Sequence, residues 1–168
     1  MKNKVVSLVL FLAIVAGISG LILGAVNSFT APLIAQNANA ELYENLGIYY
    51  PDSDFEDISD GMTDGTITAV YKAGDEGYAY QLAGNGFGGT LKILVAFDSK
   101  GTIIGVSILE QGETAGFGQE NFTEENIQKL YIGKTIDEQV DMRTGSTVTS
   151  TAMRTLISAA QASLKTML

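Results

Sequence analysis

The pattern of apolar and polar positions divides the chain into an apolar start and a mixed remainder. Residues Val5 to Val26 carry no charged side chain, and only Ser and Gly break the run of larger apolar residues and Ala. At about 1.5 Å rise per residue, a helix of this length spans roughly 33 Å, close to the bilayer's apolar core of about 30 Å. The pattern therefore predicts one transmembrane helix.

Two other interpretations of this apolar run remain open. A cleaved signal peptide agrees with Lys2 and Lys4 and with the small residues Ala38-Asn39-Ala40, although a signal peptide's apolar core usually has only about 7–15 residues. A buried helix of a globular protein seldom lacks charges on every face. We favour retention in the cytoplasmic membrane as a single span. Because both early lysines precede the span, we expect a cytoplasmic N-terminus and an extracytoplasmic C-terminal domain.

A second helix is expected directly after the span. Apolar positions recur at near-helical spacing from about Ala31 to Leu46, with Thr30 as N-cap, Pro32 in the first turn, and Tyr49-Tyr50-Pro51 as the stop. The sequence thus predicts three parts. Residues 1–30 hold the cytoplasmic tip and membrane helix, residues 31–50 a juxtamembrane helix, and residues 51–168 a folded domain.

Patterns typical of strands fill the middle of this domain. Four segments rich in β-branched and aromatic residues are separated by turn signals: Thr66–Lys72, Gly77–Leu82, Leu91–Phe97 and Thr102–Leu109. The residues Asp98-Ser99-Lys100-Gly101 predict that Leu91–Leu109 is an antiparallel hairpin.

Helical patterns close the chain. Asn121 is expected to cap a short helix that runs through Tyr131. A longer helix is predicted by apolar residues four apart: Val148, Ala152, Leu156, Ala160 and Leu164. The fold class is therefore α+β, with a small, mainly antiparallel sheet flanked by helices behind an N-terminal transmembrane helix.

Composition removes several kinds of chemistry. The chain has no cysteine, which excludes disulfides, thiol catalysis and iron–sulfur ligation. It has no histidine, so catalytic zinc and Ser-His-Asp hydrolysis are not expected. Two of the ten basic residues precede the span, and the rest face nineteen acidic ones, which disfavours nucleic acid as a partner. Redox chemistry would need an organic cofactor.

Three glycine-containing polar stretches are candidates for a site. Gly84–Gly89 has four glycines, which allow a ligand to approach the backbone, but a flexible hairpin loop explains them equally well. Gln111–Gln119 offers N–H groups and an aromatic ring, or is an ordinary strand-to-helix loop. Asp141–Thr151 (DMRTGSTVTST) has six hydroxyl residues at a predicted helix start, where either capping or phosphate binding explains them.

All three stretches resemble motifs of one family. Asp141-x-x-Thr144-Gly145-Ser146-Thr147 resembles the D-x-x-[ST]-G-[AS]-T flavinylation motif of FMN-binding domains. In that family a flavin transferase esterifies the last Thr with FMN. The stretch from Glu113 to Gly118 resembles the family's E-T-P-G-L-G loop, and Gly86-Phe87-Gly88-Gly89 resembles its glycine-rich turn. The motifs occur here in the family's order.

The resemblance implies which residues hold the cofactor. Thr147 would carry FMN as a covalent phosphoester, with Asp141, Thr144, Gly145 and Ser146 completing the recognition sequence. The flavin would be lined by Glu113, Thr114, Ala115, Gly116, Phe117 and Gly118. Ala115 replaces the usual Pro and Ser146 the commoner Ala; both are small, so we expect flavinylation to survive. No catalytic residue and no metal site is implied.

Within the family, the chain resembles G subunits of the Rnf complex, an ion-translocating ferredoxin:NAD oxidoreductase of the membrane. The implied function is an electron relay within that enzyme complex, not a complete enzyme. The implied partners are other integral membrane and redox subunits, and an extracytoplasmic flavin transferase for maturation. The alternatives are the C subunit of a sodium-pumping NADH:quinone oxidoreductase, a free-standing membrane-anchored flavoprotein, and a non-redox anchored binding domain.

Overall fold

The computed structural model describes the backbone of residues 2–168 and the side chains of residues 4–30 and 40–168. The chain forms two compact units, Met1–Glu41 and Leu42–Leu168. The first unit and the first residues of the second belong to the helix α1 (Lys2–Tyr49).

Helix α1 has a long apolar stretch at its N-terminal end. Among the described residues, Lys4–Thr30 is the one helical stretch long and apolar enough to cross a membrane, and none of its most apolar part is buried in the structure. It therefore fits a single-pass membrane anchor. The helix boundary predicted at Thr30 is absent, since α1 continues through this residue. Thr30 Oγ1 donates to the carbonyl of Val26 one turn earlier and does not cap a new helix. Pro32, which is predicted in the first turn of that second helix, belongs to the residues whose side chains the structure does not describe.

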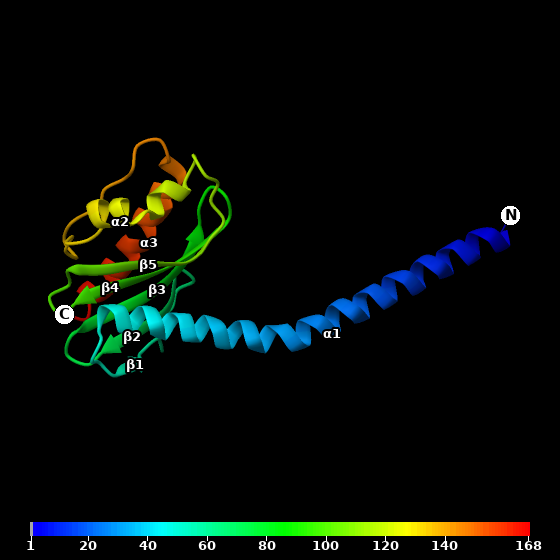
Figure 1. Ribbon diagram of the computed structural model, residues 1–168, viewed down its shortest axis with the longest axis horizontal. Helices are drawn as coiled ribbons and strands as arrows, with labels where there is room; N and C mark the ends of the chain where they lie inside the picture. Colours follow the sequence, from blue (N-terminus) through cyan, green and yellow to red (C-terminus); the bar gives the residue numbers. More distant parts are fainter. Residues whose placement is uncertain (1) are drawn as a thin grey trace. The chain divides into compact units, whose positions relative to one another are not determined.

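The second unit is built on five antiparallel strands in simple meander order (Figure 1). They are β1 (Phe55–Asp57), β2 (Ile67–Ala73), β3 (Gly77–Asn85), β4 (Thr90–Asp98) and β5 (Ile103–Gln111). The four predicted strands are confirmed as β2 to β5, and the predicted hairpin is β4–β5. Asp98 Oδ1 closes that turn by accepting from the N–H groups of Lys100 at 2.9 Å and Thr102 at 2.8 Å.

The two faces of the sheet differ in the size of their side chains. Large residues such as Tyr80, Ile93 and Val95 pack in the core that also includes residues of α2 (Glu124–Leu130) and α3 (Thr147–Lys165). The opposite face presents alanines, and Leu42, Leu46 and Tyr50 pack against them. Because successive residues of a strand point to opposite faces, this alternation gives each face a different helical layer (Figure 1).

Helices α2 and α3 differ in part from the sequence prediction. Thr123, not Asn121, caps α2, and its side chain accepts from Asn126 N at 3.4 Å. Asn121 lies one turn earlier in the 3₁₀ helix η1 (Gln119–Phe122) and is fully buried. In α3 the predicted apolar face holds at Leu156, Ala160 and Leu164, but Val148 is exposed.

Candidate functional site

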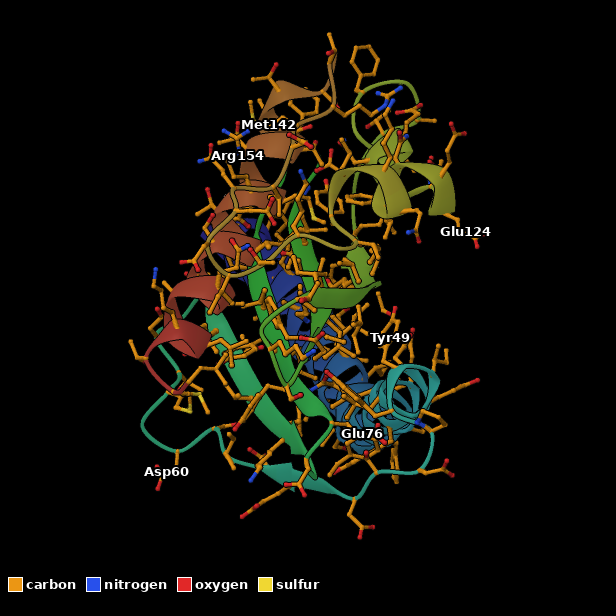
Figure 2. All side chains as sticks on the ribbon, turned by 90° about the vertical axis from the view of Figure 1, so that its left-hand side faces the viewer. Tyr49, Asp60, Glu76, Glu124, Met142 and Arg154 are labelled. Carbon is orange, nitrogen blue, oxygen red and sulfur yellow. The ribbon has the colours of Figure 1, made fainter. Side chains whose placement is uncertain are left out.

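The three stretches singled out in the sequence meet at one end of the sheet. They are the β3–β4 loop, the loop that follows β5, and the start of α3. A hollow of about 180 Å³ lies between them, lined by Phe87, Phe117 and residues 145–148. Figure 2 shows Met142, Arg154 and Glu124 in the half of the domain that holds the starts of α2 and α3, while Glu76 lies in the opposite half. The site therefore occupies one end of the domain.

Glu113 joins the first two stretches. Its side chain is buried, with 8% exposed, and its carboxylate accepts from Phe87 N at 2.8 Å and Gly88 N at 3.3 Å. A Cβ on Gly86 would overlap Glu113 Oε1, and one on Gly88 would overlap the carbonyl oxygen of Gly112. These two glycines thus make room for the protein's own carboxylate and backbone. At these two positions the structure thus gives a reason for glycine besides the approach of a ligand.

Two aromatic rings line the hollow. Phe87 and Phe117 are stacked, with ring centroids 6.4 Å apart and an angle of 24° between the planes. Both remain mostly exposed, at 62% and 63%. A flat apolar ligand that contacts these faces would remove apolar area from water, which is favourable at about 25 cal/mol per Å².

The start of α3 places hydroxyl groups in two different environments. Ser146, Thr149 and Ser150 are buried, whereas Thr144, Thr147 and Thr151 are exposed. Gly145 precedes the helix with a φ of 90°, a conformation that favours glycine. The first N–H groups of a helix lack intrahelical partners and carry partial positive charge, so a phosphate on Thr147 would be stabilised there.

Thr147 is the one motif hydroxyl that borders two hollows. It lines the aromatic hollow and a second one of about 480 Å³ between α3 and the sheet, which Thr66, Gly84 and Leu156 also line. Thr151 borders only the second among the hollows described here, and Thr144 neither. An exposed hydroxyl between two open spaces is accessible both to a modifying enzyme and to a group attached to it.

Asn121 is a residue that sequence reasoning did not assign to the site. Its Nδ2 donates to Gly118 O at 2.8 Å and to Ser146 Oγ at 2.9 Å. Its Oδ1 accepts from Ser150 Oγ at 2.9 Å. The amide thereby connects the loop after β5 with the start of α3, and its own hydrogen-bonding groups are satisfied although it is buried. Its sequence context gave only a signal for helix capping.

The remaining predicted residues shape the loops around the hollow. Thr114 to Phe117 form a tight turn, with Phe117 N donating to Thr114 O at 3.0 Å and a φ of 84° at Gly116; Ala115 is exposed within it. Asp141 pairs with Lys134, with Nζ to Oδ2 at 3.2 Å, and lies outside the hollow's lining.

Glu120 supports the turn electrostatically. The pKa of its carboxyl is held below its ordinary value by hydrogen bonds from its own N–H and from that of Gly116, with a contribution from the Arg143 charge. Glu120 therefore stays ionised at neutral pH and fixes the turn next to Phe117.

The arrangement suits FMN on three counts. The start of α3 offers N–H donors for a phosphate, Thr147 offers an exposed hydroxyl beside them, and Phe87 with Phe117 offers apolar ring faces. All three border the same hollow. A ligand with a phosphate at one end and a flat ring system at the other matches this donor set.

Comparison with known proteins agrees with this geometry. Residues 86–162 match the FMN-binding domain family, a range that starts in the β3–β4 loop and ends within α3. The chain is 28% identical to the G subunit of the ion-translocating oxidoreductase complex of Shewanella loihica over 181 aligned positions, which cover 90% of this chain and 85% of that protein. It is 26% identical to the G subunit of the proton-translocating ferredoxin:NAD(+) oxidoreductase complex of Clostridium ljungdahlii, over 90% and 87% of the two chains. Over residues 86–162, the chain is therefore similar to the FMN-binding domain family.

Proposed function

We propose that the chain is an electron-transfer subunit of a membrane complex that couples ferredoxin:NAD oxidoreduction to ion translocation, and that it carries FMN covalently on Thr147. The observation that carries this proposal is the position of Thr147, exposed at the start of α3 beside a hollow lined by two phenylalanines. Similarity over 90% of the chain to proteins named as G subunits of such complexes supports it.

Attachment requires a phosphoester bond at Thr147 Oγ1. The Oγ1–P bond forms, the hydroxyl loses its proton, and a phosphoanhydride bond breaks in an activated flavin dinucleotide donor, from which a nucleoside monophosphate leaves. In this proposal a base of the separate flavin transferase accepts the proton. The exposed Thr147 is the substrate of that enzyme in this proposal. The residues Asp141, Thr144, Gly145 and Ser146 are its recognition sequence.

The chain's own residues position and shield the bound group. The first-turn N–H groups of α3 receive the phosphate, and the ring faces of Phe87 and Phe117 pack against the flavin. Glu113 holds the loop that carries Phe87, and Glu120 the turn that carries Phe117. FMN itself supplies the reversible uptake of electrons, and the protein sets its orientation and surroundings.

The proposal also assigns the parts of the chain. Residues 1–30 form the cytoplasmic tip and the membrane helix, residues 31–50 the juxtamembrane helix, here the continuation of α1, and residues 51–168 the flavin domain outside the cytoplasm. Partner subunits oxidise ferredoxin, reduce NAD and move the ion. The chain contributes one relay step to that sequence.

The experiment is to produce the full chain together with a flavin transferase and to run it on a denaturing gel under ultraviolet light. We expect a fluorescent band for the native chain, none for Thr147→Ala, and an undiminished band for Thr151→Ala, which removes an exposed hydroxyl one turn further along α3. An unlabelled native chain, or a labelled Thr147→Ala chain, would contradict the attachment. Purification from the native membrane without other integral subunits would instead favour a free-standing flavoprotein.

A further inference from the structure

We propose that Asn121 is a positioning residue that holds the Ser146 hydroxyl away from the start of α3, so that the first-turn N–H groups stay open to the phosphate on Thr147. This inference rests on the proposed function. It assigns to Asn121, which lies outside the three stretches singled out as candidates for a site, a part in preparing the attachment site.

The first step of the argument is the behaviour of Ser146. Serine is among the preferred N-cap residues because its hydroxyl accepts from the second or third N–H group of the helix. Ser146 occupies the N-cap position of α3, with φ −136° and ψ 52°, yet its side chain makes no capping hydrogen bond. The donors that it would have covered belong to Val148 and Thr149.

The second step is the cause of this diversion. Ser146 Oγ accepts from Asn121 Nδ2 at 2.9 Å. Its only other side-chain hydrogen bond within the part of the chain that the structure describes is with Ser150 Oγ at 3.4 Å. Turning Ser146 toward its own helix would leave a buried amide N–H of Asn121 without a partner, which is costly. Asn121 cannot follow Ser146, because it is also bound to Gly118 and Ser150.

The third step is the consequence for the phosphate. A phosphodiester on Thr147 keeps a negative charge and needs donors within reach of the first helical residue. A hydroxyl that capped Val148 or Thr149 would compete with it for the same N–H groups. By binding Ser146 elsewhere, Asn121 leaves these donors available before the flavin arrives, so that the site is prepared in the unmodified chain.

The test measures the initial rate of FMN incorporation into the full chain with a limiting amount of transferase. Asn121→Ala should lower the rate roughly fivefold, the weight of one N-cap interaction. Adding Ser146→Ala to Asn121→Ala should raise the rate at least threefold, because the competing hydroxyl is gone. On a free-energy scale, this recovers about two-thirds of the rate lost in Asn121→Ala. Asn126→Ala is the matched control; it removes a side-chain amide bond to Glu120 O at 2.6 Å and should leave the rate unchanged.

A merely structural role for Asn121 predicts the opposite order. The double variant would then be no faster than Asn121→Ala, and that result would overturn the proposal. Thermal unfolding of the unmodified chains separates the two effects. We expect the double variant to melt no higher than Asn121→Ala although it takes up flavin faster.

A measurement on the native chain keeps the proposal testable if Asn121→Ala does not fold. Amide hydrogen exchange by NMR should show that the N–H groups of Val148 and Thr149 exchange rapidly in the unmodified chain and become protected after FMN attachment. Protection of both groups before attachment would overturn the proposal. If the native chain takes up no flavin at all, the proposed function fails first, whatever the exchange result.

Discussion

The carboxylate of Glu113 connects the two loops that carry Phe87 and Phe117, and its removal is the structural change with the clearest expected magnitude. In Glu113→Ala the N–H groups of Phe87 and Gly88 lose an acceptor that now lies 2.8 Å and 3.3 Å away. A hydrogen bond to a charged group contributes about 1.5–3 kcal/mol, and the longer of the two counts at the low end. We therefore expect the free energy of unfolding to fall by about 2–4 kcal/mol.

A matched control lies three residues earlier in the chain, near the end of β5. Glu110 is also a glutamate, but it is half exposed and pairs with Lys92 at the surface. Surface ion pairs contribute about 0–1 kcal/mol, so Glu110→Ala should change the unfolding free energy by less than about 1 kcal/mol. Glu113→Gln should fall between the two, because it retains one acceptor for Phe87 N and loses the charge.

The assay is thermal unfolding of the full chain in detergent, followed by the near-ultraviolet circular dichroism of its tyrosines. For a domain of this size the expected loss in Glu113→Ala corresponds to a melting temperature about 8–15 °C lower. The same variant should take up FMN more slowly, because the loop that carries Phe87 is no longer held. A melting temperature no lower than that of Glu110→Ala would refute the role assigned to the Glu113 carboxylate.

Three further changes test other parts of the site. Gly118→Ala places a Cβ 2.6 Å from Thr149 Oγ1, at an extended φ of −172°, whereas the Cβ in Gly116→Ala meets open space at a φ of 84°. The flavin fluorescence of the gel band should therefore fall further in Gly118→Ala than in Gly116→Ala. The reverse order would contradict the steric argument. Hydrogen bonds from N–H groups hold the pKa of Glu120 below its ordinary value of 4.5, so the carboxylate stabilises the folded chain above that pH and this stabilisation is lost as the pH falls. Between pH 6 and pH 3, the melting temperature of Glu120→Gln should therefore fall less than that of the native chain. Equal pH dependence of the two melting temperatures would exclude the effect. Tyr131 is buried, its hydroxyl has no hydrogen-bond partner among the described residues, and burial raises its pKa to about 12. In Tyr131→Phe the free energy of unfolding should stay the same or rise by up to about 1 kcal/mol. A clear fall in that free energy would show that the hydroxyl has a hydrogen-bond partner.

The strands were predictable because their signal is local. The segments that became β2 to β5 are rich in β-branched and aromatic residues, and Asp98 and Gly101 mark the β4–β5 turn. β1 has only three residues, of which two are acidic, and it is a strand through its pairing with β2, from Phe55 opposite Ala73 to Asp57 opposite Tyr71. A strand that depends on its partner leaves little trace in its own sequence.

The helices and the site show the same limit. A threonine at position 30 is a good N-cap by type, but its hydroxyl can equally bond back to the preceding turn, and the sequence does not decide between the two. The exposed Thr147 and the loop of Phe117 were found by motif. The roles of Glu113 and Asn121 were not, because each depends on partners about 25 or more residues away in the sequence that only the fold brings near.

The attachment site itself is open to one direct measurement. Trypsin should release residues 144–154 as a single peptide between Arg143 and Arg154, and this peptide contains all six hydroxyl residues of the cluster. Mass spectrometry of the protein purified from its native membrane should find this peptide heavier by FMN less one water, with fragment ions that place the added mass on Thr147. The unmodified peptide alone, or the added mass on Thr144 or Thr151, would contradict the account.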